Sequence, residues 1–227
     1  MSVQKSFLFD VNKCTGCAAC QIACSIENSV EAGIDWRRVH TFNPRHVPGV
    51  PSFHHSLACN HCVDPPCMKH CPALAYSKDP ETGAVTIDED KCIGCKYCSW
   101  ACPYGARELD EHQKVMKKCT LCVDRIYDQS IPEDRRKPAC VISCPTSARL
   151  FGDVHDPESE VSLAIREGGG YQLMPEWGTK PANHYLPRRK TKVRIHADEL
   201  TRIDNPLNKD DIRHEVSKEA TLDDWLM

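Results

Sequence analysis

Sixteen cysteines dominate this 227-residue sequence, and all of them lie between Cys14 and Cys144. They form four groups of four: Cys14, Cys17, Cys20 and Cys24; Cys59, Cys62, Cys67 and Cys71; Cys92, Cys95, Cys98 and Cys102; and Cys119, Cys122, Cys140 and Cys144. In a short secreted chain this density would indicate a disulfide scaffold. Residues 1–10 contain neither the apolar stretch of a signal peptide nor a twin-arginine pair, so metal-binding thiolates are the better interpretation.

The spacing within the groups indicates which metal. The first and third groups read C-x2-C-x2-C-x3-C, and the last cysteine of the second, third and fourth groups precedes a proline. In bacterial ferredoxins such a run gives three ligands to one iron-sulfur cluster and the fourth to the other cluster of a pair. Structural zinc is the alternative, but it favours two well-separated pairs of ligands. With four thiolates per cluster, sixteen cysteines predict four [4Fe-4S] clusters.

An internal repeat predicts how the groups pair. Residues 9–17 align with residues 87–95, and both copies follow a short strand-like segment. We expect an α+β fold of two bacterial-ferredoxin-like units, one inserted in the other. The inner unit covers residues 56–110, and the discontinuous outer unit covers 1–55 plus 111–151. Residues 152–227 have little regular apolar pattern and are expected to form a mostly irregular C-terminal arm that binds a partner.

Within each unit the fourth cysteine should cross over to the other cluster. The predicted ligand sets for the inner unit are Cys59, Cys62, Cys67 with Cys102, and Cys92, Cys95, Cys98 with Cys71. The predicted sets for the outer unit are Cys14, Cys17, Cys20 with Cys144, and Cys119, Cys122, Cys140 with Cys24. Because the ligands join distant segments, folding should depend on the clusters.

At these motifs the sequence resembles the four-cluster iron-sulfur subunits of molybdopterin oxidoreductases. The resemblance covers residues 5 to about 195, through Lys13–Cys17, Ser56–Cys62, Asp64–Cys67, Asp90–Cys95, Ala101–Ala106 and the segment from Lys118 to Pro145. It is greatest to the dimethyl sulfoxide, polysulfide and sulfite branch. In nitrate reductases a tryptophan occupies the position of Cys95 beside a [3Fe-4S] cluster, so Cys95 favours a complete [4Fe-4S] cluster here.

This resemblance implies an electron-transfer subunit. It would relay single electrons between a molybdenum or tungsten bis-pterin catalytic subunit and a quinone-reactive membrane subunit, in sulfur-compound respiration or oxidation. The implied location is peripheral on the inner membrane, with the cytoplasmic face favoured and the periplasmic face open through co-export with a partner. The alternatives are a freestanding polyferredoxin and an electron-transfer subunit of a hydrogenase-type complex.

Several residues beside the cysteines are expected to contact the clusters. Lys13, Lys91 and Lys118 each precede the first cysteine of a group, where a cation favours the more negative reduced cluster. Gly16 and Gly94 lie between ligands, where backbone N–H groups can approach the cluster. Trp100 is expected to cover a cluster from water. His61 and the other histidines near the second group are expected to lie outside the ligand sets, since sixteen cysteines suffice.

Composition excludes other classes of function. The net charge is −3, which gives no electrostatic footprint for nucleic acid. No apolar run approaches the roughly 18 residues of a membrane span. The sequence offers no catalytic acid, base or nucleophile, so we expect no reaction on a substrate within this chain. The basic loop at 123–139 is either an exposed loop or a contact for a partner, and the basic run at 188–194 could contact a partner protein or anionic lipid headgroups.

Overall fold

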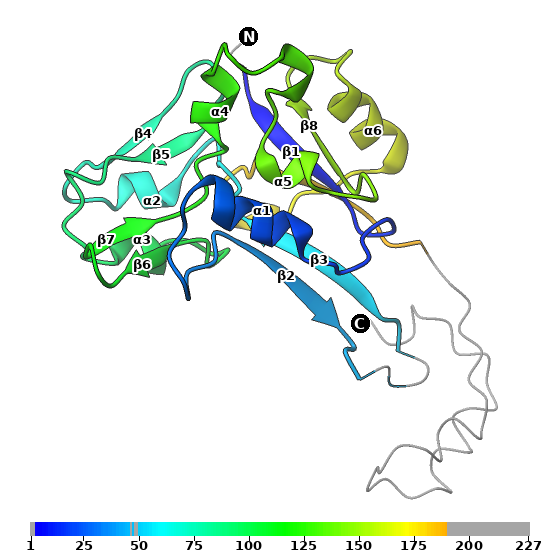
Figure 1. The fold of residues 1–227 in the computed structure, drawn as a ribbon, viewed down its shortest axis with the longest axis horizontal. Coiled ribbons are helices and arrows are strands. Elements are labelled where there is room, and N and C mark those ends of the chain that lie inside the picture. The colour runs from blue at the N-terminus through cyan, green and yellow to red at the C-terminus, as the bar shows by residue number, and fades with distance from the viewer. Residues whose placement is uncertain (1–2, 46, 48–49, 190–227) are drawn as a thin grey trace, which may run out of the picture.

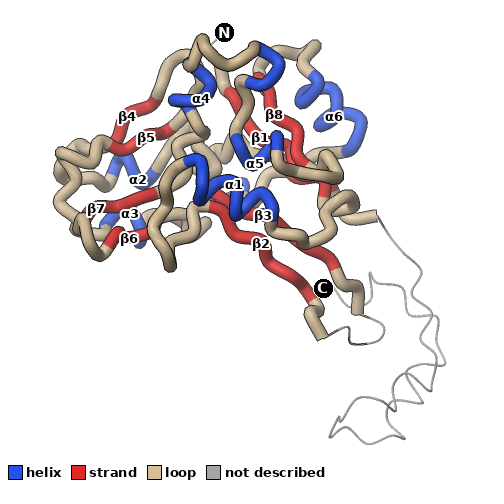
Figure 2. Tube along the Cα trace, in the orientation of Figure 1, coloured by secondary structure: helices blue, strands red, loops and turns tan. Residues whose placement is uncertain are grey.

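The computed structural model describes residues 3–45, 47 and 50–189. Short helices and small sheets are joined by loops (Figures 1 and 2). The strands are β1 (Lys5–Asp10), β2 (Arg37–Phe42), β3 (Phe53–Ala58), β4 (Tyr76–Lys78), β5 (Val85–Ile87), β6 (Glu108–Asp110), β7 (Val115–Lys117), β8 (Arg149–Asp153) and β9 (His184–Leu186). The helices are α1 (Ala19–Glu27), α2 (Pro66–Lys69), α3 (Tyr97–Trp100), α4 (Val123–Tyr127), α5 (Ala139–Ile142) and α6 (Glu160–Gly168), with 3-10 turns η1 (Glu133–Arg135) and η2 (Pro175–Trp177). The mixture confirms the α+β class.

The largest sheet has the order β8-β1-β9. β1 runs antiparallel to β8, with Phe7 opposite Phe151, and parallel to β9, with Phe9 opposite Tyr185. Phe7, Leu8 and Phe9 are buried in succession because both faces of β1 are covered. The strand before the first cysteine group is thereby joined to the strand after the fourth.

Two hairpins connect the remaining groups. β4 pairs with β5 between the second and third groups, and β6 pairs with β7 between the third and fourth. Each hairpin therefore joins the strand that leaves one group to the strand that enters the next. The β6–β7 hairpin crosses the expected boundary at residue 110, so the two expected units share a hairpin.

Residues 25–55 contain all of β2 and half of β3, and these two strands form a long hairpin. β2 pairs with β3 from Arg37 opposite Ala58 to Phe42 opposite Phe53. The hairpin projects beyond the rest of the described chain (Figure 1). Its base is the functionally important part, because the side chain of Arg37 is buried there.

Residues 152–189, which were expected to begin an extended arm, pack against the rest of the described chain. α6 contacts β8 and β1, the side chain of Val161 is fully buried, and β9 completes the sheet. Serine supplies the N-cap of α6: the hydroxyl of Ser159 accepts a hydrogen bond from the Ser162 amide. The pattern looked irregular because most of the buried residues after α6, among them Thr179, Ala182 and Asn183, lie in loops. Residues 190–227, which are half of the predicted arm and include most of the basic run at 188–194, lie outside the described residues.

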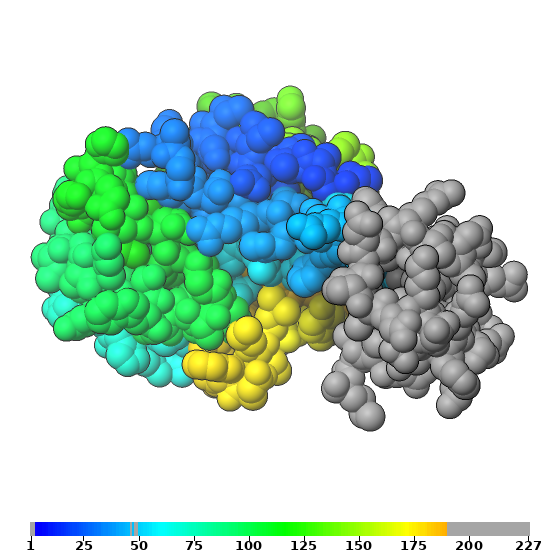
Figure 3. Space-filling model, turned by 90° about the horizontal axis from the view of Figure 1, so that it is seen from below, coloured from blue at the N-terminus to red at the C-terminus, as the bar shows by residue number. Residues whose placement is uncertain are grey.

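Residues 171–186 form a strap across the molecule. The Val63 amide donates to the Lys180 carbonyl at 2.8 Å, and the Ala182 amide donates to the Asn60 carbonyl at 3.0 Å. The strap lies against the neighbouring segments on the face shown in Figure 3, where it is yellow. It therefore fixes the loop of the second cysteine group against the main sheet. Within the described part of the chain, no helix has the length and apolarity needed to cross a membrane.

Candidate functional site

The four cysteine groups share one local design. The third cysteine of each group lies on a short helix: Cys20 on α1, Cys67 on α2, Cys98 on α3 and Cys140 on α5. The fourth cysteine follows about one helical turn later, which sets the x3 spacing. The fourth cysteine lies on the same helix only in α1, as Cys24; Cys71, Cys102 and Cys144 each lie two residues after the helix has ended.

Three cysteines of the second group lie close to one cysteine of the third group. A small hollow is lined by Cys59, Cys62 and Cys67 from the second group and by Cys102 from the third. Burial raises the pKa of Cys62 to about 12, and the neighbouring Cys59, Cys102 and Cys67 thiolates add to this rise. These four cysteines are the set expected for one inner cluster.

The other groups show the same crossing. Burial raises the pKa of Cys14, and the charges of Cys20 and Cys144 raise it further, while the Gly16 amide opposes them. Burial also raises the pKa of Cys24, together with the charges of residues of the fourth group, Cys119, Cys140 and Cys122. Cys98 packs in one apolar cluster with Cys71 and Cys92. In each case, the fourth cysteine of one group lies near cysteines of another.

Backbone amides point at several of these sulfurs. The amides of Ala75, Met116 and Ala148 donate to the sulfurs of Cys71, Cys92 and Cys144 at 3.4, 3.3 and 3.3 Å. The amides of His61 and Leu121 donate to Cys59 and Cys119 at 3.5 and 3.4 Å. Donors aimed at thiolates stabilise negative charge and help to set cluster potentials.

Four buried cations lie among the cysteines: Arg37, Arg107, Lys118 and Arg149. None of them takes part in a salt bridge among the described residues, although burying an unpaired charge is costly. Arg107 donates to the sulfur of Cys67 at 2.7 Å and to that of Cys59 at 3.4 Å. Lys118 donates to the carbonyls of Val85 and Cys119. The thiolates supply the countercharge.

The effect on the thiolates is visible at two cysteines. Burial alone would raise the pKa of Cys59, but the charges of Arg107 and Lys118 outweigh it and bring that pKa to about 7. Burial would likewise raise the pKa of Cys20, and the charges of Arg149 and Arg37 lower it below its usual value. At these two cysteines the buried cations therefore favour anionic sulfur, the form that binds iron in a cluster.

Unpartnered polar atoms test whether these surroundings fit such a cluster. Within the described residues, Nε of Arg37, Arg107 and Arg149 is buried without a hydrogen-bond partner, as are both side-chain polar atoms of Asn60. No three His, Cys, Asp or Glu side chains in this part of the chain gather closely enough to hold a single metal ion. Cysteine sets lined by unused cationic donors fit anionic clusters, whose sulfides accept hydrogen bonds.

The lysines expected near the clusters differ in their surroundings. Lys118 is buried among the sulfurs, whereas Lys13 and Lys91 are exposed at the surface and form ion pairs with Asp10 and Asp88. The paired carboxylates offset the positive charge of these two lysines. Of these three lysines, only Lys118 lies close to cysteines without a carboxylate partner among the described residues.

The other residues expected near the clusters, two glycines, a tryptophan and a histidine, also differ in their surroundings. Gly16 and Gly94 adopt positive φ angles of 73° and 67°, which glycine allows. Trp100 is 77% exposed and packs beside Tyr97, with ring centroids 5.4 Å apart. His61 is fully buried, and its Nδ1 accepts a hydrogen bond from the Val85 amide at 3.1 Å. His61 thus supports the loop of the second group.

Gly94→Ala is expected to destabilise the protein more than Gly105→Ala. Both glycines have positive φ, which costs a non-glycine residue about 1–2 kcal/mol. A Cβ at Gly94 would also lie 2.3 Å from the Lys114 carbonyl oxygen, whereas a Cβ at Gly105 meets no atom within 4 Å. Anaerobic denaturation with iron analysis measures the difference. Equal losses of stability in the two variants would contradict this explanation.

Sequence reasoning missed Arg37, Arg107, Arg149 and the strap. The two arginines at 107 and 149 did carry a signal, because each is the fifth residue after a cysteine that precedes proline. The Tyr104 hydroxyl bonds the Thr179 hydroxyl at 2.6 Å, which ties the third group to the strap. Arg37 and the strap reach the site only through tertiary pairing.

Comparison with known proteins finds relatives over nearly the whole length of the chain. A 4Fe-4S dicluster domain family matches residues 50–154. The chain is 55% identical to a sulfite dehydrogenase subunit of Allochromatium vinosum, over 97% of this chain and 98% of the relative. It is 38% identical to a subunit of the anaerobic dimethyl sulfoxide reductase of Escherichia coli, over 69% and 77%, and 35% identical to a subunit of the polysulfide reductase of Wolinella succinogenes, over 84% and 97%. The chain therefore belongs to the electron-transferring iron-sulfur subunits of the molybdopterin oxidoreductase family.

Proposed function

We propose that this protein holds four [4Fe-4S] clusters in the crossed ligand sets, within two ferredoxin-like units of which one interrupts the other. The observation that carries this proposal is the hollow in which Cys102 joins Cys59, Cys62 and Cys67. The neighbours of Cys14, Cys24 and Cys98 support the other three sets. Each cluster, when bound, accepts and releases one electron at a time.

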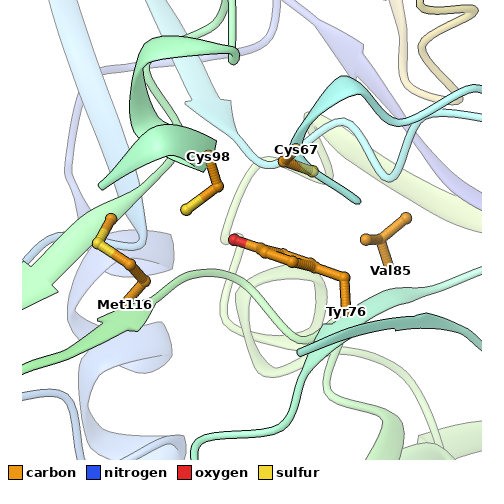
Figure 4. Packing of buried hydrophobic residues seen from close by; sticks show 5 residues of the cluster. All are labelled: Cys67, Tyr76, Val85, Cys98 and Met116. Atoms are coloured by element: carbon orange, nitrogen blue, oxygen red, sulfur yellow. The ribbon is translucent and has the colours of Figure 1, made fainter. Parts of the chain in front are cut away.

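Contacts between sets support a linear order of the four clusters. Cys20 belongs to the ligand set that includes Cys144, and Cys140 belongs to the set that includes Cys24. These two side chains pack in the same group of apolar residues. Cys119 of that second set packs with Cys59 of the inner unit. Cys67 then packs with Cys98 of the last set, with Tyr76 between them (Figure 4). The protein positions neighbouring clusters at these three junctions and excludes water there.

The proposed role is to carry electrons along this order between a molybdenum or tungsten bis-pterin catalytic subunit and a quinone-reactive membrane subunit. The relatives named for sulfite dehydrogenase, dimethyl sulfoxide reductase and polysulfide reductase support a role in sulfur-compound metabolism. Such a complex places this chain peripherally on the inner membrane. The cytoplasmic face is favoured, with the periplasmic face reached by co-export.

Elemental analysis of the native complex tests the proposal. The complex is isolated anaerobically from membranes through a tag on this chain, and iron, zinc, molybdenum and tungsten are measured. We expect about 16 iron atoms per chain, plus those of any partner, together with molybdenum or tungsten. Full iron in a chain that is isolated alone, without either pterin metal, would instead support a freestanding carrier. Zinc in place of iron would contradict the cofactor assignment.

A further inference from the structure

Three loops of the chain repeat the same backbone path after a cysteine. Each reads Cys-Pro-x-x-Ala, and the residue three positions after the cysteine has positive φ: Leu74 at 50°, Gly105 at 58° and Ser147 at 50°. In each loop the amide of that residue donates to the carbonyl of the cysteine. The side chain five positions after the cysteine should therefore be aimed in a corresponding direction. The residues at this fifth position are Tyr76, Arg107 and Arg149.

Each fifth side chain approaches the third cysteine of the set that includes the loop's own cysteine. Arg107, after Cys102, contacts Cys67 at 2.7 Å. Arg149, after Cys144, lies beside Cys20. Tyr76, after Cys71, directs its hydroxyl toward Cys98 (Figure 4). This arrangement occurs in three of the four proposed sets. The fifth residue is a cation in two of them and the neutral phenol of Tyr76 in the third.

The two arginines are held rigidly in place. Arg149 lies over the ring of Phe9, 5.0 Å from its centroid, and donates to the Ser56 carbonyl at 3.3 Å. Arg107 lies over the ring of Tyr76 at 5.7 Å and donates to the Ala106 carbonyl at 3.0 Å. Both residues are buried, so water screens their charges little. Fixed charges in such surroundings act strongly on a neighbouring anion.

We propose that this fifth position tunes the reduction potentials of three of the four clusters: Arg107 and Arg149 raise the potentials of their own clusters, and Tyr76 provides no charge at this position to its own cluster. The inference rests on the proposed ligand sets. Reduction adds one negative charge to a cluster, and a buried guanidinium beside one ligand sulfur stabilises that added charge. The phenol of Tyr76 can offer a hydrogen bond but no net charge.

A redox titration of the intact complex, followed by electron paramagnetic resonance, tests the proposal. In Arg107→Met, one of the four components is expected to move to a more negative potential. At fixed ambient potential its reduced-to-oxidised ratio should fall at least about tenfold, which equals about 59 mV for one electron. Arg107→Lys should restore most of the potential. Arg149→Met should move a different component, and Tyr76→Phe should move a third by less.

Lys69→Met is the matched control. Lys69 lies two residues after Cys67, but its side chain is 59% exposed and pairs with Asp64 at 2.6 Å. Removing this charge should leave all four potentials unchanged. If Arg107→Met loses iron, Arg107→Gln replaces it under the same criterion. Unmoved potentials, or equal movement of all components, would overturn the proposal.

Iron content separates this proposal from the proposed function. Wild-type protein with far fewer than about 16 iron atoms per chain would contradict the four cluster sets. Full iron content with potentials insensitive to Arg107 and Arg149 would contradict the role of the fifth position alone.

Discussion

Cys102→Ala should alter the same cluster as Cys62→Ala, and a different cluster from Cys95→Ala. Cys102 follows Cys95 in the sequence, yet it lines the hollow of Cys59, Cys62 and Cys67. Loss of one ligand should release one iron, leaving a three-iron cluster, or release all four. Electron paramagnetic resonance of the reduced complex identifies the altered component, and iron analysis counts the loss.

The reciprocal variant makes the test sharper. Cys71→Ala should alter the cluster that Cys95→Ala alters, because Cys71 packs with Cys92 and Cys98. If Cys102→Ala and Cys95→Ala changed one common signal, the ligands would follow the order of the sequence and the crossed sets would be wrong. This comparison does not require each resonance signal to be assigned to a particular cluster. It asks only which pairs of variants alter the same signal.

Arg37→Met is expected to reduce the free energy of unfolding by about 3–5 kcal/mol, the range for removing one partner of a buried charge pair. Arg37 is 2% exposed, and cysteines of two proposed sets surround it, among them Cys140 and Cys20. Methionine fills similar space but leaves the buried anions with one fewer countercharge. Anaerobic denaturation of the cluster-loaded protein, followed by visible absorbance, measures the loss.

The next residue provides the control. Arg38 also lies on β2, but its side chain is 41% exposed and pairs with Glu108. An exposed ion pair contributes at most about 1 kcal/mol, so Arg38→Met should have a small effect. A loss of stability as large in Arg38→Met as in Arg37→Met would show that burial among the thiolates is not the cause.

The sequence was sufficient for the cofactor type and the fold class because both depend on local spacing. A C-x2-C-x2-C-x3-C run places its third cysteine on a short helix and its fourth one turn later, whatever surrounds it. The positive φ angles of Gly16 and Gly94 follow from the same local geometry. The packing of residues 152–189 was not predicted because Val161 and Tyr185 bury their side chains through tertiary contacts, which leave no periodic pattern.

Two lysines show why a residue's role could not be predicted from its motif. Lys91 and Lys118 both precede the first cysteine of a group. Lys91 follows a turn that contains Asp88. The ammonium group of Lys91 forms an ion pair with the Asp88 carboxylate at 2.7 Å, and the Lys91 side chain remains exposed. Lys118 follows β7, and its ammonium reaches the carbonyl of Val85 on another hairpin. Long-range packing, absent from the motif, decides between surface and interior.

The parallel pairing of β1 with β9 has a consequence for biosynthesis. Phe9 leaves the ribosome long before its partner Tyr185, and at about 5–20 residues per second the delay is about 10–35 s. During that interval one edge of β1 is unpaired, and the loop of the second cysteine group is not covered by residues 171–186. Closure of the sheet is therefore a late event in folding, since contacts between distant segments form slowly. All sixteen cysteines are therefore synthesised before the segment that covers the loop of the second group.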